Sequence, residues 1–250
     1  MTEIMDSILE VRNLSRRFGA LRAVDEISFK AERGHITSVI GPNGAGKSTL
    51  FNLITGAILP NSGDVYFNGL DVTSMPIRQK LRQGMARSFQ ITNLFFELSV
   101  LENLRLAAQF LEEPRFGFLP VLHSKRAVSK SEELLQKFEL TAKAPLRAGE
   151  LSHGERRRLE IAVTLASEPE LLLLDEPTQG MSHADTEETA EMIRALSSEI
   201  SILLIEHDIS LVMDLSDHVV VMHQGAKLAE GMPVAVRNDP AVKEAYLGHA

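Results

Sequence analysis

Residues 41–48, GPNGAGKS, restrict the fold of this chain more than any other feature of its sequence. They match the pattern G-x-x-x-x-G-K-[ST]. The short β-branched run at residues 37–40 predicts a strand before the loop, and the apolar periodicity of residues 49–55 predicts a helix after it. A strand, a glycine-rich loop and a helix in this order predict an α/β fold built around a phosphate-binding loop.

Each residue type in this loop suits the phosphate groups of a nucleotide. The glycines let backbone N–H groups turn inward, and the following helix directs its positive end to the same place. Lys47 brings a positive charge to the β- and γ-phosphates, and the Ser48 hydroxyl is placed to bind Mg²⁺. The expected nucleotide-binding residues are Gly41, Pro42, Asn43, Gly44, Ala45, Gly46, Lys47, Ser48 and Thr49.

Two acids follow a second predicted strand. Four leucines at residues 171–174 precede Asp175 and Glu176, and a continuous apolar run of this kind is typical of a parallel strand buried on both faces. Ligands of α/β sheets bind at the carboxyl ends of such strands. We therefore expect Asp175 to support Mg²⁺, directly or through water. Glu176 comes next, so we expect it to point to the opposite side and polarise the attacking water as a general base.

The rest of the chain predicts a core interrupted by a helical segment. Residues 1–90 and 155–250 are expected to form a nucleotide-binding α/β core with a β subdomain, and residues 91–154 a helical subdomain. Strands are predicted at residues 8–11, 27–30, 65–67 and 201–206, a tight turn at Asn68 and Gly69, and helices at 98–106 and 131–140.

Composition excludes several classes of function. The 250 residues include no cysteine, which excludes a disulfide scaffold, a thiolate nucleophile and a cysteine metal site. The formal net charge of −8 argues against nucleic-acid binding, and the basic cluster at residues 156–158 is expected to be a solvated helix face. Neither a secretory signal nor an apolar run of roughly 18 to 20 residues is evident, so we expect a soluble, cytoplasmic chain.

Further landmarks resemble the ATP-binding cassette (ABC) transporter family over essentially the whole chain. Residues 151–155, LSHGE, resemble the family signature LSGGQ, and Gln90, in the run RSFQ, resembles the glutamine of the Q-loop. His207, after the predicted strand at 201–206, resembles the switch histidine, and Phe18 stands where the family stacks an aromatic ring on adenine. The resemblance implies a P-loop NTPase core with a mostly parallel sheet, an N-terminal antiparallel β subdomain and an inserted helical subdomain.

The resemblance also implies a mechanism that uses ATP and Mg²⁺. Two chains would sandwich two ATP molecules, and the signature of one chain would contact the γ-phosphate bound by the other. His207 would hydrogen-bond the γ-phosphate and the attacking water, and Gln90 would join the metal shell. The signature residues are Ser152, His153, Gly154 and Glu155. Ser152 and Glu155 also form a capping box at a predicted helix start, which is compatible with this role.

Two positions depart from the family pattern. His153 stands at the third signature position, where the family has glycine, and Ser182 stands where the family often has aspartate. The first departure bears on the geometry of the closed pair, and the second on communication between subunits. Neither affects the loop predicted to bind ATP.

The resemblance to one branch of the family indicates a cargo. Residues 180–182, the insertion at 91–130 and the tail at 242–248 are similar to importers of branched-chain amino acids, although the tail is also similar to the lipopolysaccharide-export ATPase. Urea, another amphipathic amino acid and lipid export are alternatives. A soluble cassette acting on DNA or ribosomes is less favoured, since the chain has one cassette and no heptad run. Intact Lys47, Glu176 and His207 argue against a non-hydrolysing regulatory cassette.

The resemblance implies partners at a membrane. These are a second ATPase subunit, identical or a paralogue, integral membrane permeases and a periplasmic substrate-binding protein, with the chain on the cytoplasmic face of the inner membrane. Residues 93–96 are the candidate docking surface for a permease helix, with the alternative that they close the core of the helical insertion itself.

Overall fold

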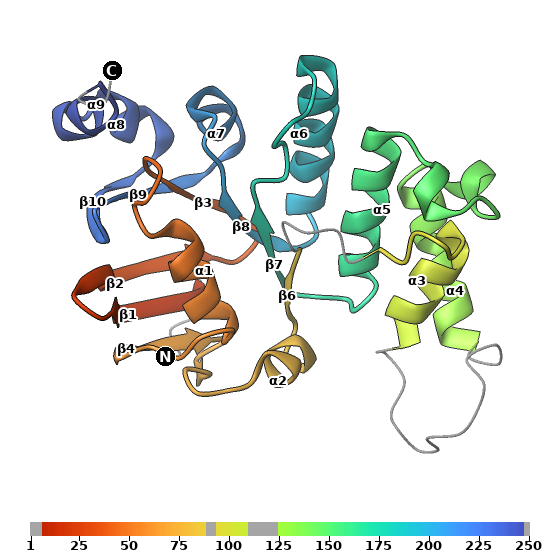
Figure 1. The fold of residues 1–250 in the computed structure, drawn as a ribbon, viewed down its shortest axis with the longest axis horizontal. Helices are drawn as coiled ribbons and strands as arrows, with labels where there is room; N and C mark the ends of the chain where they lie inside the picture. The colour runs from red at the N-terminus through yellow and green to blue at the C-terminus, as the bar shows by residue number, and fades with distance from the viewer. Residues whose placement is uncertain (1–6, 89–93, 110–124, 248–250) are drawn as a thin grey trace, which may run out of the picture.

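The computed structural model describes residues 7–88, 94–109 and 125–247, and places them in two sheets with helices around them (Figure 1). One sheet has four antiparallel strands in the order β2-β1-β4-β5, and the other has six strands in the order β10-β9-β3-β8-β7-β6. The P-loop α/β architecture with an added antiparallel sheet is confirmed. None of the helices within these three ranges is long and apolar enough to cross a membrane.

The antiparallel sheet comes from the first 71 residues. Its strands are β1 (Ser7–Phe18), β2 (Leu21–Glu32), β4 (Ser62–Phe67) and β5 (Leu70–Asp71). The strands predicted at 8–11, 27–30 and 65–67 are confirmed, although β1 and β2 are longer than predicted. Asn68 and Gly69 both have positive φ angles, of 51° and 76°, and make the predicted tight turn between β4 and β5.

The six-stranded sheet brings distant segments to one edge. Its strands are β3 (Ile36–Ile40), β6 (Met85–Arg87), β7 (Leu171–Asp175), β8 (Ser201–Ile205), β9 (His218–His223) and β10 (Ala226–Gly231). All neighbouring pairs are parallel except β9 and β10. Because β3, β7 and β8 are parallel neighbours, the segments that follow them lie together at their carboxyl ends.

Helices cover both faces of this sheet (Figure 1). The helices of the described residues are α1 (Lys47–Thr55), α2 (Ile77–Arg82), α3 (Val100–Ala108), α4 (Lys125–Lys137), α5 (His153–Leu165), α6 (His183–Ser197), α7 (Ile209–Leu215), α8 (Pro233–Asn238) and α9 (Pro240–Leu247). Two 3₁₀ turns, Thr141–Lys143 and Ala148–Glu150, join α4 to α5.

Alternate residues of β7 enter different hydrophobic cores. Leu171 and Leu173 pack in a core with α1 and the antiparallel sheet, whereas Leu172 and Leu174 pack in a core with α3 to α6. Successive side chains of a strand point to opposite faces, so a strand covered on both sides is apolar throughout. The leucine run predicted this burial. Packing on both faces fixes the end of β7 between the two hydrophobic cores.

The helical segment lies at one end of the molecule, where α3, α4 and α5 pack together (Figure 1). The helix predicted at residues 98–106 is α3, which begins two residues later because Ser99 is its N-cap and forms a capping box with Glu102. The bounds predicted for the next helix, 131–140, are wrong, because α4 starts at Lys125 and ends at Lys137. Glu139 then turns the chain with a φ of 55°.

Candidate functional site

The loop between β3 and α1 has backbone positions that only glycine fits. Gly41 and Gly46 have φ angles of 155° and 101°. A Cβ atom on Gly41 would lie 2.2 Å from the carbonyl oxygen of Met222, and one on Gly46 would lie 2.1 Å from that of Ala23. The two fixed glycines of the pattern G-x-x-x-x-G-K-[ST] are therefore required here by their positive φ angles and by close backbone packing.

The same loop is tied to both sheets. The N–H of Gly225, in the turn between β9 and β10, donates to the oxygen of Ala45 at 3.0 Å, and the N–H of Asp25 in β2 donates to Gly225 at 2.8 Å. Gly46 is the N-cap of α1 and gives no side-chain hydrogen bond to its first turn. The first N–H groups of a helix have no partner within the helix, so this end of α1 suits an anion.

Lys47 is buried within the loop. Its Nζ atom donates to the carbonyl oxygens of Gly41 at 2.6 Å and Pro42 at 3.2 Å. Burial lowers the pKa of Lys47, and the negative charges of Glu176 and Asp175 oppose that shift. The structure therefore brings the predicted phosphate-binding lysine within electrostatic reach of both predicted acids.

Asp175, at the end of β7, has one oxygen engaged and one open. Its Oδ2 accepts a hydrogen bond from Arg87 at 2.7 Å, and Arg87 also donates to Oδ1 of Asn52 on α1 at 2.6 Å. The Oδ1 atom of Asp175 is buried, and none of the described residues gives it a hydrogen-bond partner. An open buried carboxylate oxygen suits a cation.

These residues fit Mg²⁺ as part of a larger ligand set. Mg²⁺ takes oxygen ligands and is usually held by one or two protein groups together with substrate phosphates. Asp175 and the exposed Ser48 offer such oxygens. The described part of the chain contains no group of three or more His, Cys, Asp and Glu residues that could hold a metal alone. The metal role of both residues stays a prediction.

Glu176 does not continue the strand. Its φ of 46° is left-handed, and its N–H donates to Ile205 at the end of β8 at 2.9 Å. Strand alternation therefore does not set the direction of its side chain, contrary to our prediction. The side chain lines a cavity of about 130 Å³ together with His153 and Met181. A non-glycine residue in this conformation costs about 1 kcal/mol, and such residues cluster at functional sites.

His207 follows β8 and is half exposed, beside a buried acid that the sequence analysis did not single out. This acid is Glu206, whose Oε2 accepts the N–H of His207 at 3.1 Å and whose Oε1 accepts the hydroxyl of Thr178 at 2.6 Å. The only signal for Glu206 in the sequence is a charged residue directly after an apolar strand. That signal does not show that Thr178 and His207 are its hydrogen-bond partners.

The signature segment starts α5 as predicted. Ser152 is the N-cap, its Oγ accepts the N–H of Glu155 at 3.3 Å, and Glu155 accepts the N–H of Ser152 at 2.9 Å. This hydrogen bond, together with Lys143, lowers the pKa of Glu155 to about 2. The capping box is confirmed. His153 and Gly154 form the first turn of α5, and His153 faces the cavity that Glu176 also lines.

The remaining predicted residues have varied surroundings. Phe18 ends β1 and is 46% exposed, with the guanidinium of Arg16 4.9 Å from its ring centre, so its outer face is available for stacking. Gln90 lies outside the described residues. Ser182 is the N-cap of α6 and accepts the N–H of Asp185 at 3.3 Å, so serine has a structural role at this departure from the family pattern.

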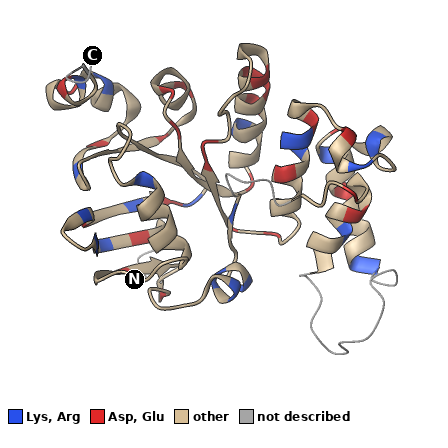
Figure 2. Cartoon of the chain, viewed as in Figure 1, with Lys and Arg blue, Asp and Glu red and all other residues tan. Residues whose placement is uncertain are grey.

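The basic cluster is not a solvated face throughout. Arg157 is only 9% exposed and pairs with Glu160 at 2.6 Å, which corrects the prediction for this residue. Arg158 is partly buried and pairs with Glu139 and Glu188. Figure 2 shows acidic and basic residues mixed along the helices of this part of the molecule.

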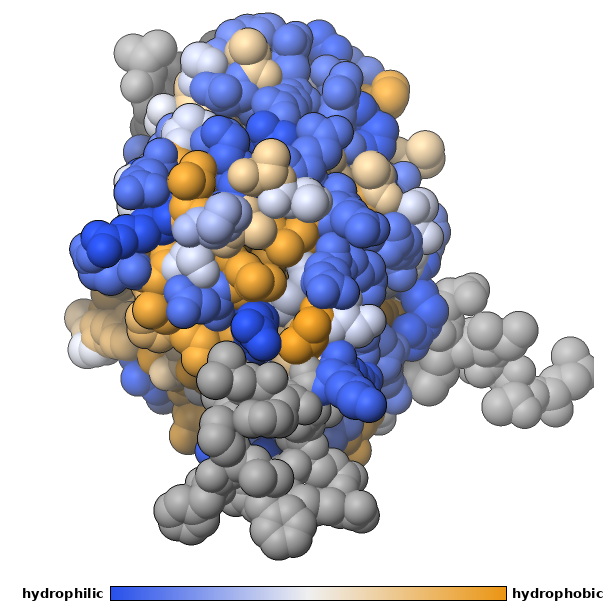
Figure 3. Space-filling view, turned by 90° about the vertical axis from the view of Figure 1, so that its right-hand side faces the viewer, coloured by the Kyte–Doolittle hydropathy of each residue, from blue (hydrophilic) through white to orange (hydrophobic). Residues whose placement is uncertain are grey.

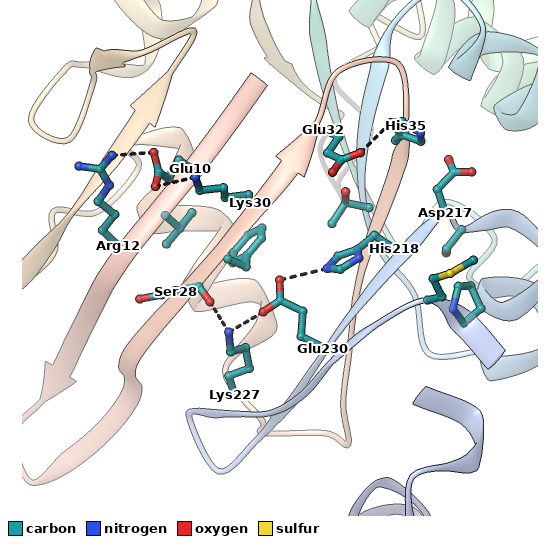
Figure 4. A pocket seen from close by; sticks show the side chains of 16 residues that line it. Glu10, Arg12, Ser28, Lys30, Glu32, His35, Asp217, His218, Lys227 and Glu230 are labelled. Carbon is teal, nitrogen blue, oxygen red and sulfur yellow. Dashed lines mark hydrogen bonds and ion pairs between the residues drawn. The ribbon is translucent and has the colours of Figure 1, made fainter. Parts of the chain in front are cut away.

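A large cavity of the described residues lies away from these groups. It has a volume of about 800 Å³ and lies at the amino ends of β3 and β9, whereas the phosphate loop follows the carboxyl end of β3. Its charged side chains pair with one another (Figure 4): Glu230 with His218 and Lys227, and Glu10 with Arg12 and Lys30. The Nζ atom of Lys227 also donates to the backbone oxygen of Ser28 at 2.6 Å, which joins β10 to β2 of the antiparallel sheet.

Comparisons with known proteins agree with this geometry. Residues 24–179 match the family model described as ABC transporter, and residues 226–250 match the model described as branched-chain amino acid ATP-binding cassette transporter. The chain is 41% identical to the high-affinity branched-chain amino acid transport ATP-binding proteins BraF of Pseudomonas aeruginosa and LivG of Escherichia coli K12. Each alignment covers 97% of this chain and 98% of the relative.

Solved structures are similar over the same length. The structure of an ATP-binding cassette of an ABC transporter in its ADP conformation superposes with a TM-score of 0.88 at 33% identity, covering 97% of this chain and 99% of that one. A nucleotide-free cassette from an ABC transporter gives a TM-score of 0.86 at 32% identity, covering 96% and 98%.

Proposed function

Since this chain belongs to the ABC transporter family and is an ATPase that energises transport, we propose that its cargo is branched-chain amino acids. One observation carries this proposal. The likeness to BraF and LivG extends over the whole chain, and the C-terminal 25 residues match a segment described for branched-chain amino acid cassettes. The cargo stated in the names of these relatives is therefore supported by a match over the whole chain and by a separate match over its C-terminal segment.

We assign the chemistry of ATP hydrolysis to groups at the carboxyl edge of the six-stranded sheet. The glycine loop and Lys47 hold the phosphates, and Glu176 accepts a proton from the attacking water. His207 donates a hydrogen bond to the γ-phosphate, and Phe18 stacks on adenine. Ser48 and Asp175 would hold Mg²⁺, which would supply positive charge where the phosphate oxygens gain negative charge.

A second subunit completes the site. The first turn of α5 has the N–H groups of a helix start and the Ser152 hydroxyl, which suit an anion. In the working pair this turn meets the γ-phosphate held by the other chain, a second copy or a paralogue. ATP then favours the closed pair because it contacts both chains, and hydrolysis releases it.

We further propose that the chain docks beneath membrane permeases through Phe95 and Phe96, which are 60% and 41% exposed. Figure 3 looks onto the helical end of the molecule and shows apolar residues gathered on that side. Leu94 is buried in the core of that segment, so it serves the alternative role that the sequence left open. Phe96→Asp is expected to weaken permease binding, with Leu70→Asp on the antiparallel sheet as the control.

We also propose that the chain lies on the cytoplasmic face of the membrane, with permeases and a periplasmic binding protein as partners.

Transport assays test the cargo assignment. The complex is purified from membranes and reconstituted in proteoliposomes with ATP inside. We expect uptake of leucine, isoleucine and valine, and its loss with Glu176→Gln. Uptake of urea, or export of lipid, without uptake of these three amino acids would overturn the cargo assignment.

A further inference from the structure

Glu206 is a fully buried acid between two catalytic segments. It follows the last residue of β8, and its exposed fraction is 0%. Its Oε1 atom accepts hydrogen bonds from the N–H of Thr178 at 3.0 Å and from the Thr178 hydroxyl at 2.6 Å. Its Oε2 atom accepts the N–H of His207 at 3.1 Å and lies 3.5 Å from Nδ1 of the same histidine. Both carboxylate oxygens are thus used on two different loops.

The segment after β7 is fixed to the end of β8 at two levels. The N–H of Glu176 donates to the carbonyl oxygen of Ile205 at 2.9 Å, and two residues later Thr178 donates twice to Glu206. Pro177 lies between them and restricts its own φ. The left-handed Glu176 is therefore held from both sides, which is the condition under which a strained backbone conformation persists.

The burial of this carboxylate has a clear physical meaning. A buried charge is costly unless hydrogen bonds compensate it, and an apolar side chain of similar size would avoid that cost. No lysine or arginine among the described residues forms an ion pair with Glu206, and the ring nitrogen nearest to its carboxylate there is Nδ1 of His207, at 3.5 Å. The stabilising contribution of Glu206 must therefore come from its bonds to Thr178 and His207.

We propose that Glu206 is a positioning residue that holds the loop of Glu176 and the backbone of His207 as one unit, so that base and γ-phosphate contact move together. This inference rests on the proposed function, since it takes Glu176 and His207 as catalytic. Both carboxylate oxygens of Glu206 already accept hydrogen bonds from Thr178 and His207. Its effect reaches the chemistry only through the two residues that it places.

The first test is Glu206→Gln in the full-length chain. The amide keeps one oxygen for Thr178 but turns an NH₂ group toward the N–H of His207, so two donors face each other. We expect kcat for ATP hydrolysis to fall about 100-fold, as misplacement of a catalytic group does. ATP affinity should stay close to wild type, because the phosphate loop is held elsewhere. Glu230→Gln, which also alters an acid beside a histidine, His218, is the matched control and should keep full activity.

The second test uses the other end of the contact. Thr178→Val removes the hydroxyl and should lower kcat. Thr178→Ser keeps the hydroxyl and should retain the kcat of the wild type. Because the two changes disturb the same coupled unit, one at its His207 side and one at its Thr178 side, Glu206→Gln combined with Thr178→Val should cost little more than the more harmful single change. This set remains informative if Glu206→Gln does not fold.

These experiments distinguish failure of the proposed function from failure of the positioning role of Glu206. A wild-type chain without magnesium-dependent ATPase activity would contradict the proposed function itself. A wild-type chain that hydrolyses ATP, with normal kcat in Glu206→Gln or in Thr178→Val, would overturn the positioning role alone. So would equal losses of kcat and ATP affinity, or full additivity in the double variant.

Discussion

The Nη2 atom of Arg87 lies 2.7 Å from Oδ2 of Asp175, and the two side chains are only 12% and 1% exposed. Arg87 ends β6, three residues before Gln90, and also holds Asn52 on α1. This contact joins the strand leading to the predicted Q-loop, the helix that follows the phosphate loop and the acid predicted to support Mg²⁺. Asp175 keeps its other oxygen open, so pairing with Arg87 and metal support are compatible.

Arg87→Met is expected to destabilise the fold by about 3 kcal/mol, because it leaves a buried carboxylate without its partner. Urea denaturation measures the change. Magnesium with ATP should recover part of the loss, since a cation near Asp175 replaces the missing positive charge. The exposed pair of Arg33 and Glu170 provides the control: Arg33→Met should cost about 1 kcal/mol or less. Equal costs for the two variants would contradict the role of burial.

Glu176→Gln is expected to trap ATP in a stable dimer, because binding remains while the proton acceptor is lost. Turnover should fall by about 100-fold or more, which ATPase assays and the size of the protein in solution measure together. Glu139 is another acid in a left-handed conformation, and its carboxylate pairs with Arg158 on α5. Glu139→Gln is the control and should leave turnover unchanged. Near-normal hydrolysis by Glu176→Gln would refute the assignment of Glu176 as the general base.

Ser152→Ala is expected to affect both stability and ATP-dependent pairing. Loss of the N-cap costs about 1 kcal/mol of folding stability. The chain contains a second capping box of the same kind, formed by Ser99 and Glu102 at the start of α3. Ser99→Ala should show the same loss of stability with ATP-dependent dimerisation intact. If both variants dimerise equally well, Ser152 has only the structural role.

Lys80 gives a prediction about pH. It is buried against the end of α1, where its Nζ donates to Ile54 at 2.7 Å, and burial lowers its pKa to about 8. The unfolded chain binds a proton at Lys80 up to the ordinary pKa of 10.5, so between these values unfolding takes up a proton and stability rises with pH. Lys80→Met should lack this rise. Urea denaturation at pH 7.5 and pH 10 tests it, and identical pH slopes in both proteins would contradict it.

The parts of the site that could be predicted are those encoded within one continuous segment. The glycine loop, the leucine strand before Asp175 and the capping box at Ser152 each have a local pattern with a local cause. The contacts that hold these segments together have no such pattern. Arg87 and Asp175 are 88 residues apart, and Glu206 and Thr178 are 28 residues apart. Only the pairing of parallel strands brings them together.

The bounds of helices and strands likewise follow the local sequence in part and depend on contacts between segments for the rest. Periodicity located α4, but its end depends on the left-handed turn at Glu139, which the sequence does not mark with glycine. The direction of Glu176 was inferred from strand alternation, and the strand ends one residue too early for that rule. In both cases a backbone conformation stabilised by tertiary contacts overrode the local pattern.

The central claim is that residues 41–48 hold the phosphates of ATP. Calorimetric titration of the purified full-length chain with ATP, with and without Mg²⁺, tests it most directly. We predict magnesium-dependent binding by the wild-type chain and a large loss of affinity in Lys47→Ala, while Lys227→Ala in β10 binds as the wild type does. Absence of magnesium-dependent binding, or full affinity in Lys47→Ala, would contradict the account.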